Sequence, residues 1–223
     1  MKTPLLLLLA IGLTGCASTK IDVRNEAEAA KFNPTDTARI RLFTGEGVYG
    51  GFATGHSCES FFKKANEELS KEQLGWKDAH VHTPGLYPWR ESDSRNLVVG
   101  MPPSKASRKV NDTMQQYDEH VVPANKPLIV NLYIWSSAAS CAPKPASFTP
   151  EPGRDYEFQV ETYKISTFSA GCAIRSRNLE VIDGTTKELP LNPNLCVFGP
   201  TGGRTLSMQD KLKQTDRDVE VSK

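Results

Sequence analysis

The sequence predicts a mostly β fold, an antiparallel β-sandwich with one amphipathic helix near residues 57–72. Several short segments alternate apolar and polar residues, which is the period of a strand with two different faces. These segments follow one another at intervals of roughly ten residues, with turn residues between them. Only one segment has apolar residues at helical spacing, so helices contribute little to the expected architecture.

The first predicted strand covers residues 38–43 and alternates strictly. Ile40 and Leu42 lie on one face, and Arg39 and Arg41 lie on the other. This pattern is typical of a strand with one buried face and one face in water. We therefore expect both arginines to be exposed to solvent.

A glycine-rich segment at residues 45–50 follows and is expected to be a flexible loop. The helix begins after it, where Ser57 can cap the first turn and Glu59 suits the positive end of the helix dipole. Its apolar side chains recur on one face, which predicts three or four turns packed on the sheet (Phe61, Phe62, Ala65 and Leu69).

Residues 75–107 are interrupted by prolines and show no regular pattern, apart from a short strand predicted at residues 96–100. Three aromatic residues lie in this region, Trp76, Tyr87 and Trp89. Exposed aromatic side chains favour recognition of a partner. We therefore expect this region and the glycine-rich loop to form a recognition surface.

The second half contains most of the predicted strands, at residues 117–122, 128–135, 155–161, 172–182 and 187–191. Asp183-Gly184 is a hairpin turn signal. The sandwich domain is expected to span residues 38–199 and to be Ig-like or transthyretin-like, and the polar residues 200–223 are expected to form a loosely held tail.

The N-terminus has the features of an export signal. Lys2 precedes the apolar stretch Leu5–Leu13, which is about half of the ~20 residues that cross a bilayer. Leu13-Thr14-Gly15-Cys16 resembles the lipobox of bacterial lipoproteins. The resemblance implies a signal peptide at residues 1–15, cleavage before Cys16 and attachment of a lipid to its thiol.

The residue after the lipidated cysteine bears on localisation. In such lipoproteins an aspartate there typically retains the protein at the inner membrane, and Ala17 therefore implies the periplasmic face of the outer membrane. Residues 16–37 are polar and are expected to form the lipidated N-terminus and a tether. Such a tether, fully extended, could reach about 65–70 Å.

The charge balance and the number of cysteines limit which classes of partner and which cellular compartment are expected. The 27 basic and 26 acidic residues are balanced, which argues against nucleic acid and leaves the membrane and an envelope protein as the expected partners. Apart from Cys16, four cysteines remain: Cys58, Cys141, Cys172 and Cys196. An even number in an oxidising compartment predicts two disulfides.

Three pairings of these cysteines are possible, and the sequence does not choose among them. Proximity along the chain favours Cys172–Cys196 with Cys58–Cys141. Four reduced, buried thiols are the alternative.

Motifs for chemistry are weak. Residues 45–50 match G-x-G-x-x-G, but the predicted helix begins too late for its amides to meet a phosphate, so no cofactor is expected. His80 and His82 lie on the same side of an extended segment and suit a metal-binding lipoprotein as one alternative. An envelope hydrolase is another, with Cys58 beside His56. Because no complete metal or nucleophile motif is present, we expect neither a metal site nor a catalytic site.

Three short motifs resemble those of a group of uncharacterised proteobacterial lipoproteins. They are Ala38-Arg-Ile-Arg-Leu-Phe43, Val122-Pro-Ala-Asn-Lys-Pro127 and Phe148-Thr-Pro-Glu-Pro-Gly-Arg-Asp-Tyr156. The resemblance implies a small β-sandwich and carries no activity. The expected function is therefore a non-catalytic binding or structural role in the cell envelope.

Overall fold

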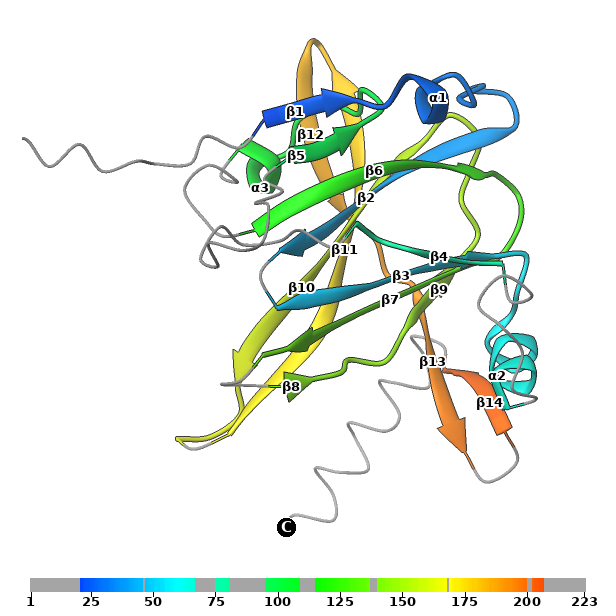
Figure 1. Ribbon diagram of the computed structural model, residues 1–223, viewed down its shortest axis with the longest axis vertical. Helices are drawn as coiled ribbons and strands as arrows, with labels where there is room; N and C mark the ends of the chain where they lie inside the picture. The colour runs from blue at the N-terminus through cyan, green and yellow to red at the C-terminus, as the bar shows by residue number, and fades with distance from the viewer. Residues whose placement is uncertain are drawn as a thin grey trace, which may run out of the picture.

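The computed structural model describes residues 21–206, except 46, 67–74, 81–94, 109–114, 137–139, 168 and 200–201. The prediction of a mostly β fold is confirmed, and the described helices are few and short (Figure 1). The predicted signal peptide, Cys16 and Ala17 lie outside the described residues. The strands are β1 (Ile21–Arg24), β2 (Thr37–Gly45), β3 (Val48–Thr54), β4 (Trp76–Asp78), β5 (Arg95–Val98), β6 (Gln115–Pro123), β7 (Leu128–Trp135), β8 (Ser140–Cys141), β9 (Ala146–Phe148), β10 (Asp155–Lys164), β11 (Ala170–Ile182), β12 (Thr185–Pro190), β13 (Asn194–Gly199) and β14 (Gly202–Leu206). The helices are α1 (Glu26–Ala29), α2 (Cys58–Asn66) and α3 (Lys105–Arg108).

Most strands belong to one curled sheet with the order β12-β11-β10-β2-β3-β7-β9-β13-β14, in which β6 also pairs with β2. The sheet is mixed, because β10 runs parallel to β2. The prediction of a purely antiparallel arrangement is therefore wrong. Among the described residues, β2 and β3 share a single residue pair, Gly45 with Val48, so the strand pairing that links the two halves of the sheet is confined to this hairpin.

The main hydrophobic core contains residues from both halves of the sheet. Ile40, Leu42 and Phe158 come from one half, and Val130 and Leu132 come from the other; all five are fully buried. They occupy the apolar positions of the alternating segments. The apolar faces predicted for these strands therefore form the core as expected.

The polar face of β2 is also buried, which corrects the prediction that Arg39 and Arg41 are exposed to water. Arg41 is only 1% exposed, and Arg39 forms a two-point ion pair with Asp155 on β10. The covering layer consists of β1, which pairs in parallel with β5, together with α1 and the residues that follow β5. Two strand faces are therefore buried where the sequence pattern predicts one.

The covering layer also corrects the predicted tether at residues 16–37. From residue 21 onward this segment is folded against the domain. The carboxylate of Glu28 on α1 accepts a hydrogen bond from the backbone N–H of Val121 at 3.0 Å. Burial disfavours its charged form, but the hydrogen bonds from Lys31 and Val121 outweigh this and lower the pKa of Glu28.

The predicted helix is present as α2, and the Ser57 side chain accepts a hydrogen bond from the backbone N–H of Ser60. The predicted Leu69 lies outside the described residues. The helix packs on β13 and β14, where a side chain on Gly203 would collide with Phe62. Because β14 is a strand, the predicted loose tail is wrong for residues 202–206.

Two disulfides are present, as predicted, but the favoured pairing is wrong. Cys58 on α2 pairs with Cys196 on β13, and Cys141 pairs with Cys172. β14 brings β13 against α2, so residues 138 positions apart are neighbours. Distance along the chain is therefore a poor guide to pairing here.

The glycine-rich segment is not a flexible loop. Gly50 and Gly51 lie in β3, where an added side chain on either would come within about 2 Å of a neighbouring backbone oxygen (2.0 Å and 2.1 Å). Gly47 has φ +79° in the turn before the strand. The glycines therefore allow a tight hairpin and close strand contacts. In the part of the chain that the structure describes, we find no helix with the length and apolar character needed to cross a bilayer.

Candidate functional site

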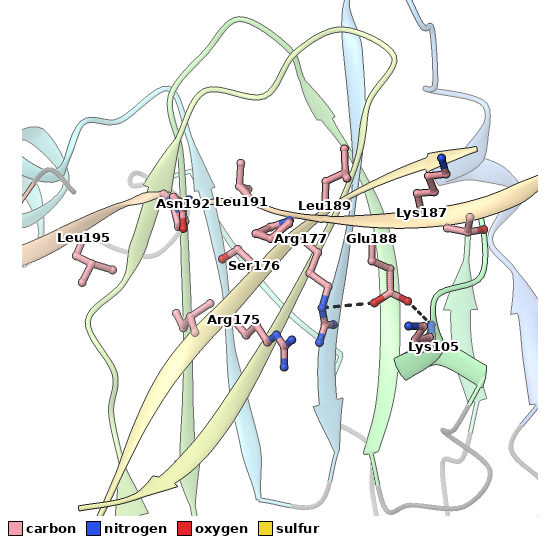
Figure 2. A pocket seen from close by; sticks show the side chains of 14 residues that line it. Lys105, Arg175, Ser176, Arg177, Lys187, Glu188, Leu189, Leu191, Asn192 and Leu195 are labelled. Atoms are coloured by element: carbon pink, nitrogen blue, oxygen red, sulfur yellow. Dashed lines mark hydrogen bonds and ion pairs between the residues drawn. The ribbon is translucent and has the colours of Figure 1, made fainter. Parts of the chain in front are cut away.

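A groove of about 760 Å³ lies beside β11 and β12, at one end of the sheet (Figure 2). β11 supplies residues 174–177, β12 supplies residues 186–190, and the chain that leads to β13 closes one side. α3 contributes Lys105 at the margin. The groove is therefore built by the hairpin that ends the sheet and by the covering layer.

β12 is the last strand of the sheet, and no described strand pairs with its outer edge. The backbone N–H of Leu191 donates to the carbonyl of Ser176, which fixes the alternation of the antiparallel pair. The backbone N–H and C=O groups of Lys187 and Leu189 consequently point toward β11. The N–H and C=O groups of Thr186 and Glu188 point outward, away from β11, and so does the carbonyl of Pro190. Proline has no N–H group, so it leaves no donor without a partner at this edge.

Charged side chains line one end of the groove. Glu188 lies 3.6 Å from the Nε atom of Arg177 and accepts a hydrogen bond from the backbone N–H of Lys105 (Figure 2). Arg175 pairs with Glu161 on β10 at 2.7 Å. Lys105 is exposed at the margin, so this end of the groove offers cationic groups to a ligand.

Lys187 and Leu189 lie on the other face of β12 from Glu188 (Figure 2). Leu189 is 41% exposed although it is apolar. Ile174, Leu191 and Leu195 add further apolar lining. The groove thus combines an open strand edge, apolar contacts and positive charge.

The described lining of the groove lacks two residue types that often act as an activated nucleophile and its base. Among the described residues that line the groove, none is a histidine or a cysteine. Ser176 is buried, and its Oγ atom has no hydrogen-bond partner in the structure. No described base lies within hydrogen-bond distance of this hydroxyl, so the described residues include no group bonded to it that would activate it.

The buried charges behind the groove hold β10 and β11 to β2. Arg177 donates to Glu157 at 2.7 Å, and Glu157 also accepts a hydrogen bond from Arg41 at 3.1 Å. Burial disfavours the charged guanidinium, but Glu119 and Glu157 outweigh this effect and raise the pKa of Arg41. The charged end of the groove is therefore continuous with a structural network.

A second hollow of about 400 Å³ lies beside α2 and β13. Phe62, Pro143 and Phe198 contribute to its lining. Phe198 is 63% exposed and contacts Phe62 through its ring. This hollow is smaller and carries only one charged side chain, Lys144.

Of the three predicted recognition residues, Trp76 alone is among the described residues. Trp76 lies in β4, packs against Phe61 and donates its indole N–H to Asp78 at 2.7 Å. It therefore serves packing at the α2 end of the sheet. Tyr87 and Trp89 lie outside the described residues.

The alternatives based on histidine and cysteine gain no support. Cys58 is bonded to Cys196, so it has no thiol to act as the nucleophile suggested beside His56. His82 lies outside the described residues, as does most of the segment after His80. Within the described ranges, no group of three histidine, cysteine, aspartate or glutamate side chains is placed to hold a metal ion.

Sequence reasoning missed the groove because none of its residues forms a recognised motif. One signal was present in the strand at residues 187–191. Pro190 falls within an alternating segment, and proline in a strand is typical of a sheet edge. Leu189 and Leu191 flank it and are the apolar residues expected to be buried on a central strand.

No family model, curated protein or solved structure matches this chain. The geometry of the groove and the sequence of the N-terminus are therefore the basis for assigning a function.

Proposed function

We propose that the chain is a lipoprotein anchored to the periplasmic face of the outer membrane, where its β domain has a non-catalytic binding role. The observation that carries this proposal is the pairing of the cysteines in disulfides. Four of the five pair with one another, and the fifth is Cys16 of the lipobox-like motif. Disulfides favour a compartment outside the cytoplasm, and the remaining cysteine is available for the lipid.

In this proposal the two halves of the curled sheet are the two layers of the predicted sandwich. Their apolar faces share one core, as the layers of a sandwich do. The lipid holds this domain at the membrane, and the edge of β12 remains available to a partner.

Replacing Cys16 by alanine is expected to release the protein from the membrane. One or more acyl chains supply the anchor, and the domain itself has no described helix that could replace them. Fractionation of cells that express the wild type and Cys16→Ala would show the wild type in the outer membrane and the variant in the soluble periplasmic fraction.

Ala17→Asp is the matched control for localisation. It keeps the lipidated cysteine and is expected to move the protein from the outer to the inner membrane. A Cys16→Ala variant that still sediments with the outer membrane would refute the lipid anchor.

We propose further that the partner contributes an extended segment that adds to the outer edge of β12. Strand addition supplies main-chain hydrogen bonds, here to Thr186 and Glu188, and side-chain pockets supply specificity. Leu189 and Leu191 favour apolar side chains in the segment. Lys105 and Lys187 favour acidic ones, since opposite charges steer the encounter of two proteins.

Thr186→Pro is expected to abolish partner binding. Proline at this position removes an outward N–H, which the partner needs, and leaves the hydrogen bonds between β12 and β11 intact. A photo-reactive amino acid at Leu189, activated in intact cells, is expected to form an adduct with one envelope protein, and Thr186→Pro to remove that adduct.

Thr186→Ala is the control, because it changes the same side chain and keeps the N–H. The adduct is expected to persist in this variant. Equal adduct formation in the proline and alanine variants, with a folded domain in both, would reject strand addition at β12.

A further inference from the structure

The lipid anchor and the folded domain are separated by a very short piece of chain. β1 begins at Ile21, five residues after Cys16. At 3.3–3.6 Å per residue, a chain of this length spans at most about 18 Å. If the lipid is attached as in the proposed function, the start of β1 cannot lie further than this from the lipid surface.

The start of β1 is firmly held, so the connection does not lengthen easily. All four residues of β1 pair with β5, and the Asn96 side chain donates to Asp22 at 2.8 Å. After β1, the backbone N–H of Asn25 donates to the carbonyl of Val98 at 2.8 Å. Freeing residues 21–32 would also expose a buried hydrophobic cluster, against which Ala29 and Phe32 pack (Val99, Met101, Val121 and Leu179).

The surface around the start of β1 has charges that suit phospholipid headgroups. Arg95 lies opposite Ile21 in the register of the two strands, and α3 carries Lys105 and Arg108; all three basic residues are exposed. Two described carboxylates nearby are engaged within the protein, Asp22 with Tyr117 and Glu188 with the backbone of Lys105. Basic side chains are attracted to an anionic membrane surface.

β1 and β5 begin on the side of the molecule where α3 lies (Figure 1). α2, β13 and β14 lie at the opposite end of the view. We propose that the β1–β5–α3 end of the domain rests on the phospholipid surface and that the α2–β14 end points away from it. This orientation rests on the proposed lipid anchor and adds to it a defined membrane-facing surface.

The orientation is tested with the full-length lipidated protein in vesicles of phosphatidylethanolamine and phosphatidylglycerol. A photo-reactive amino acid is placed at Arg108 or, as the control, at Phe198, which is also exposed. This chemistry introduces no new thiol beside the two disulfides. Crosslinking to phospholipid is expected to be several-fold higher at position 108 than at position 198.

A second experiment lengthens the chain between Cys16 and β1. A flexible Gly/Ser insertion of about 20 residues between Lys20 and Ile21 has a root-mean-square length of about 25 Å and frees the domain from the surface. The ratio of crosslinking at the two positions is expected to fall to near one, while the protein stays in the vesicles.

The outcomes separate the orientation from the anchor. Equal crosslinking at both positions in vesicle-bound protein without the insertion would overturn the orientation and leave the lipid anchor standing. A ratio that the insertion does not change would also overturn it, because chain length would then have no part in it. Protein that carries no lipid and does not enter the vesicles would overturn the anchor and the orientation together.

Discussion

Replacing Arg41 by leucine is expected to lower the free energy of unfolding by about 3–5 kcal/mol, the cost of breaking a buried ion pair from one side. Arg41 donates to Glu119 at 2.7 Å and to Glu157 at 3.1 Å, and all three side chains are at most 2% exposed. Its guanidinium also lies over the ring of Tyr117, 4.9 Å from the centroid. Without it, Glu157 keeps its hydrogen bond from Arg177, whereas Glu119 loses the cation to which it is bonded.

Glu119 shows why this network determines the position of the covering layer. One of its carboxylate oxygens accepts hydrogen bonds from three successive backbone N–H groups, those of Val99, Gly100 and Met101 (2.7, 2.9 and 3.1 Å). The other accepts both hydrogen bonds from Arg41. The carboxylate therefore joins the sheet to the segment after β5, and loss of Arg41 is expected to loosen both.

The measurement is urea unfolding of the soluble Cys16→Ala chain with its disulfides intact, with and without Arg41→Leu. Arg175→Leu is the matched control, since Arg175 pairs with Glu161 on the same sheet but is largely exposed. Such exposed pairs contribute about 0–1 kcal/mol. Similar losses for the two variants would show that the buried network has no special role in stability.

Removing the Cys58–Cys196 disulfide is expected to be similarly damaging, with a loss of about 4–5 kcal/mol. A disulfide stabilises chiefly by restricting the unfolded chain, and this one closes a loop of 138 residues. Cys58 and Cys196 are also part of a buried cluster with Phe61 and Ile129. Their loss therefore removes the link that holds α2 to β13.

Cys141–Cys172 is the control because it closes a loop of only 31 residues. In the chain-entropy description its contribution is smaller by about 1 kcal/mol. Guanidinium unfolding of Cys58→Ala/Cys196→Ala and of Cys141→Ala/Cys172→Ala compares the two directly. The first variant is expected to unfold at the lower denaturant concentration, and the reverse order would contradict the role given to the α2–β13 link.

The alternating pattern identified the central strands because their apolar positions are continuous. Ile40 and Leu42 in β2 and Tyr156, Phe158 and Val160 in β10 are all buried, as their period of two predicts. The prediction for the polar positions of β2 is wrong. An alternating pattern shows that a strand has two different faces, but it does not show what covers each face. Here residues 21–32 and 95–108 cover the charged face of the strand. No local sequence pattern predicts such a contact between segments that are distant in the chain.

The remaining differences have similar causes. Gly50 was read as part of a loop because glycine is common in loops, whereas here the backbone of Asn131 approaches too closely for any side chain. β14 is polar and glycine-rich, and it is a strand of the sheet because it pairs with β13 and packs on α2. Pro190 is the one residue of β12 that indicates a sheet edge, because an edge is a property of the sheet order, of which the other residues of this strand carry no sign.

The intact mass of the mature protein, extracted from the membrane with its disulfides kept, tests the central claim most directly. A lipid-anchored protein with two disulfides is predicted to begin at Cys16, to carry the added mass of diacylglycerol and an amide-linked acyl chain, and to resist alkylation of its cysteines. A mature chain that begins elsewhere, or a Cys16 thiol that alkylates freely, would contradict the account.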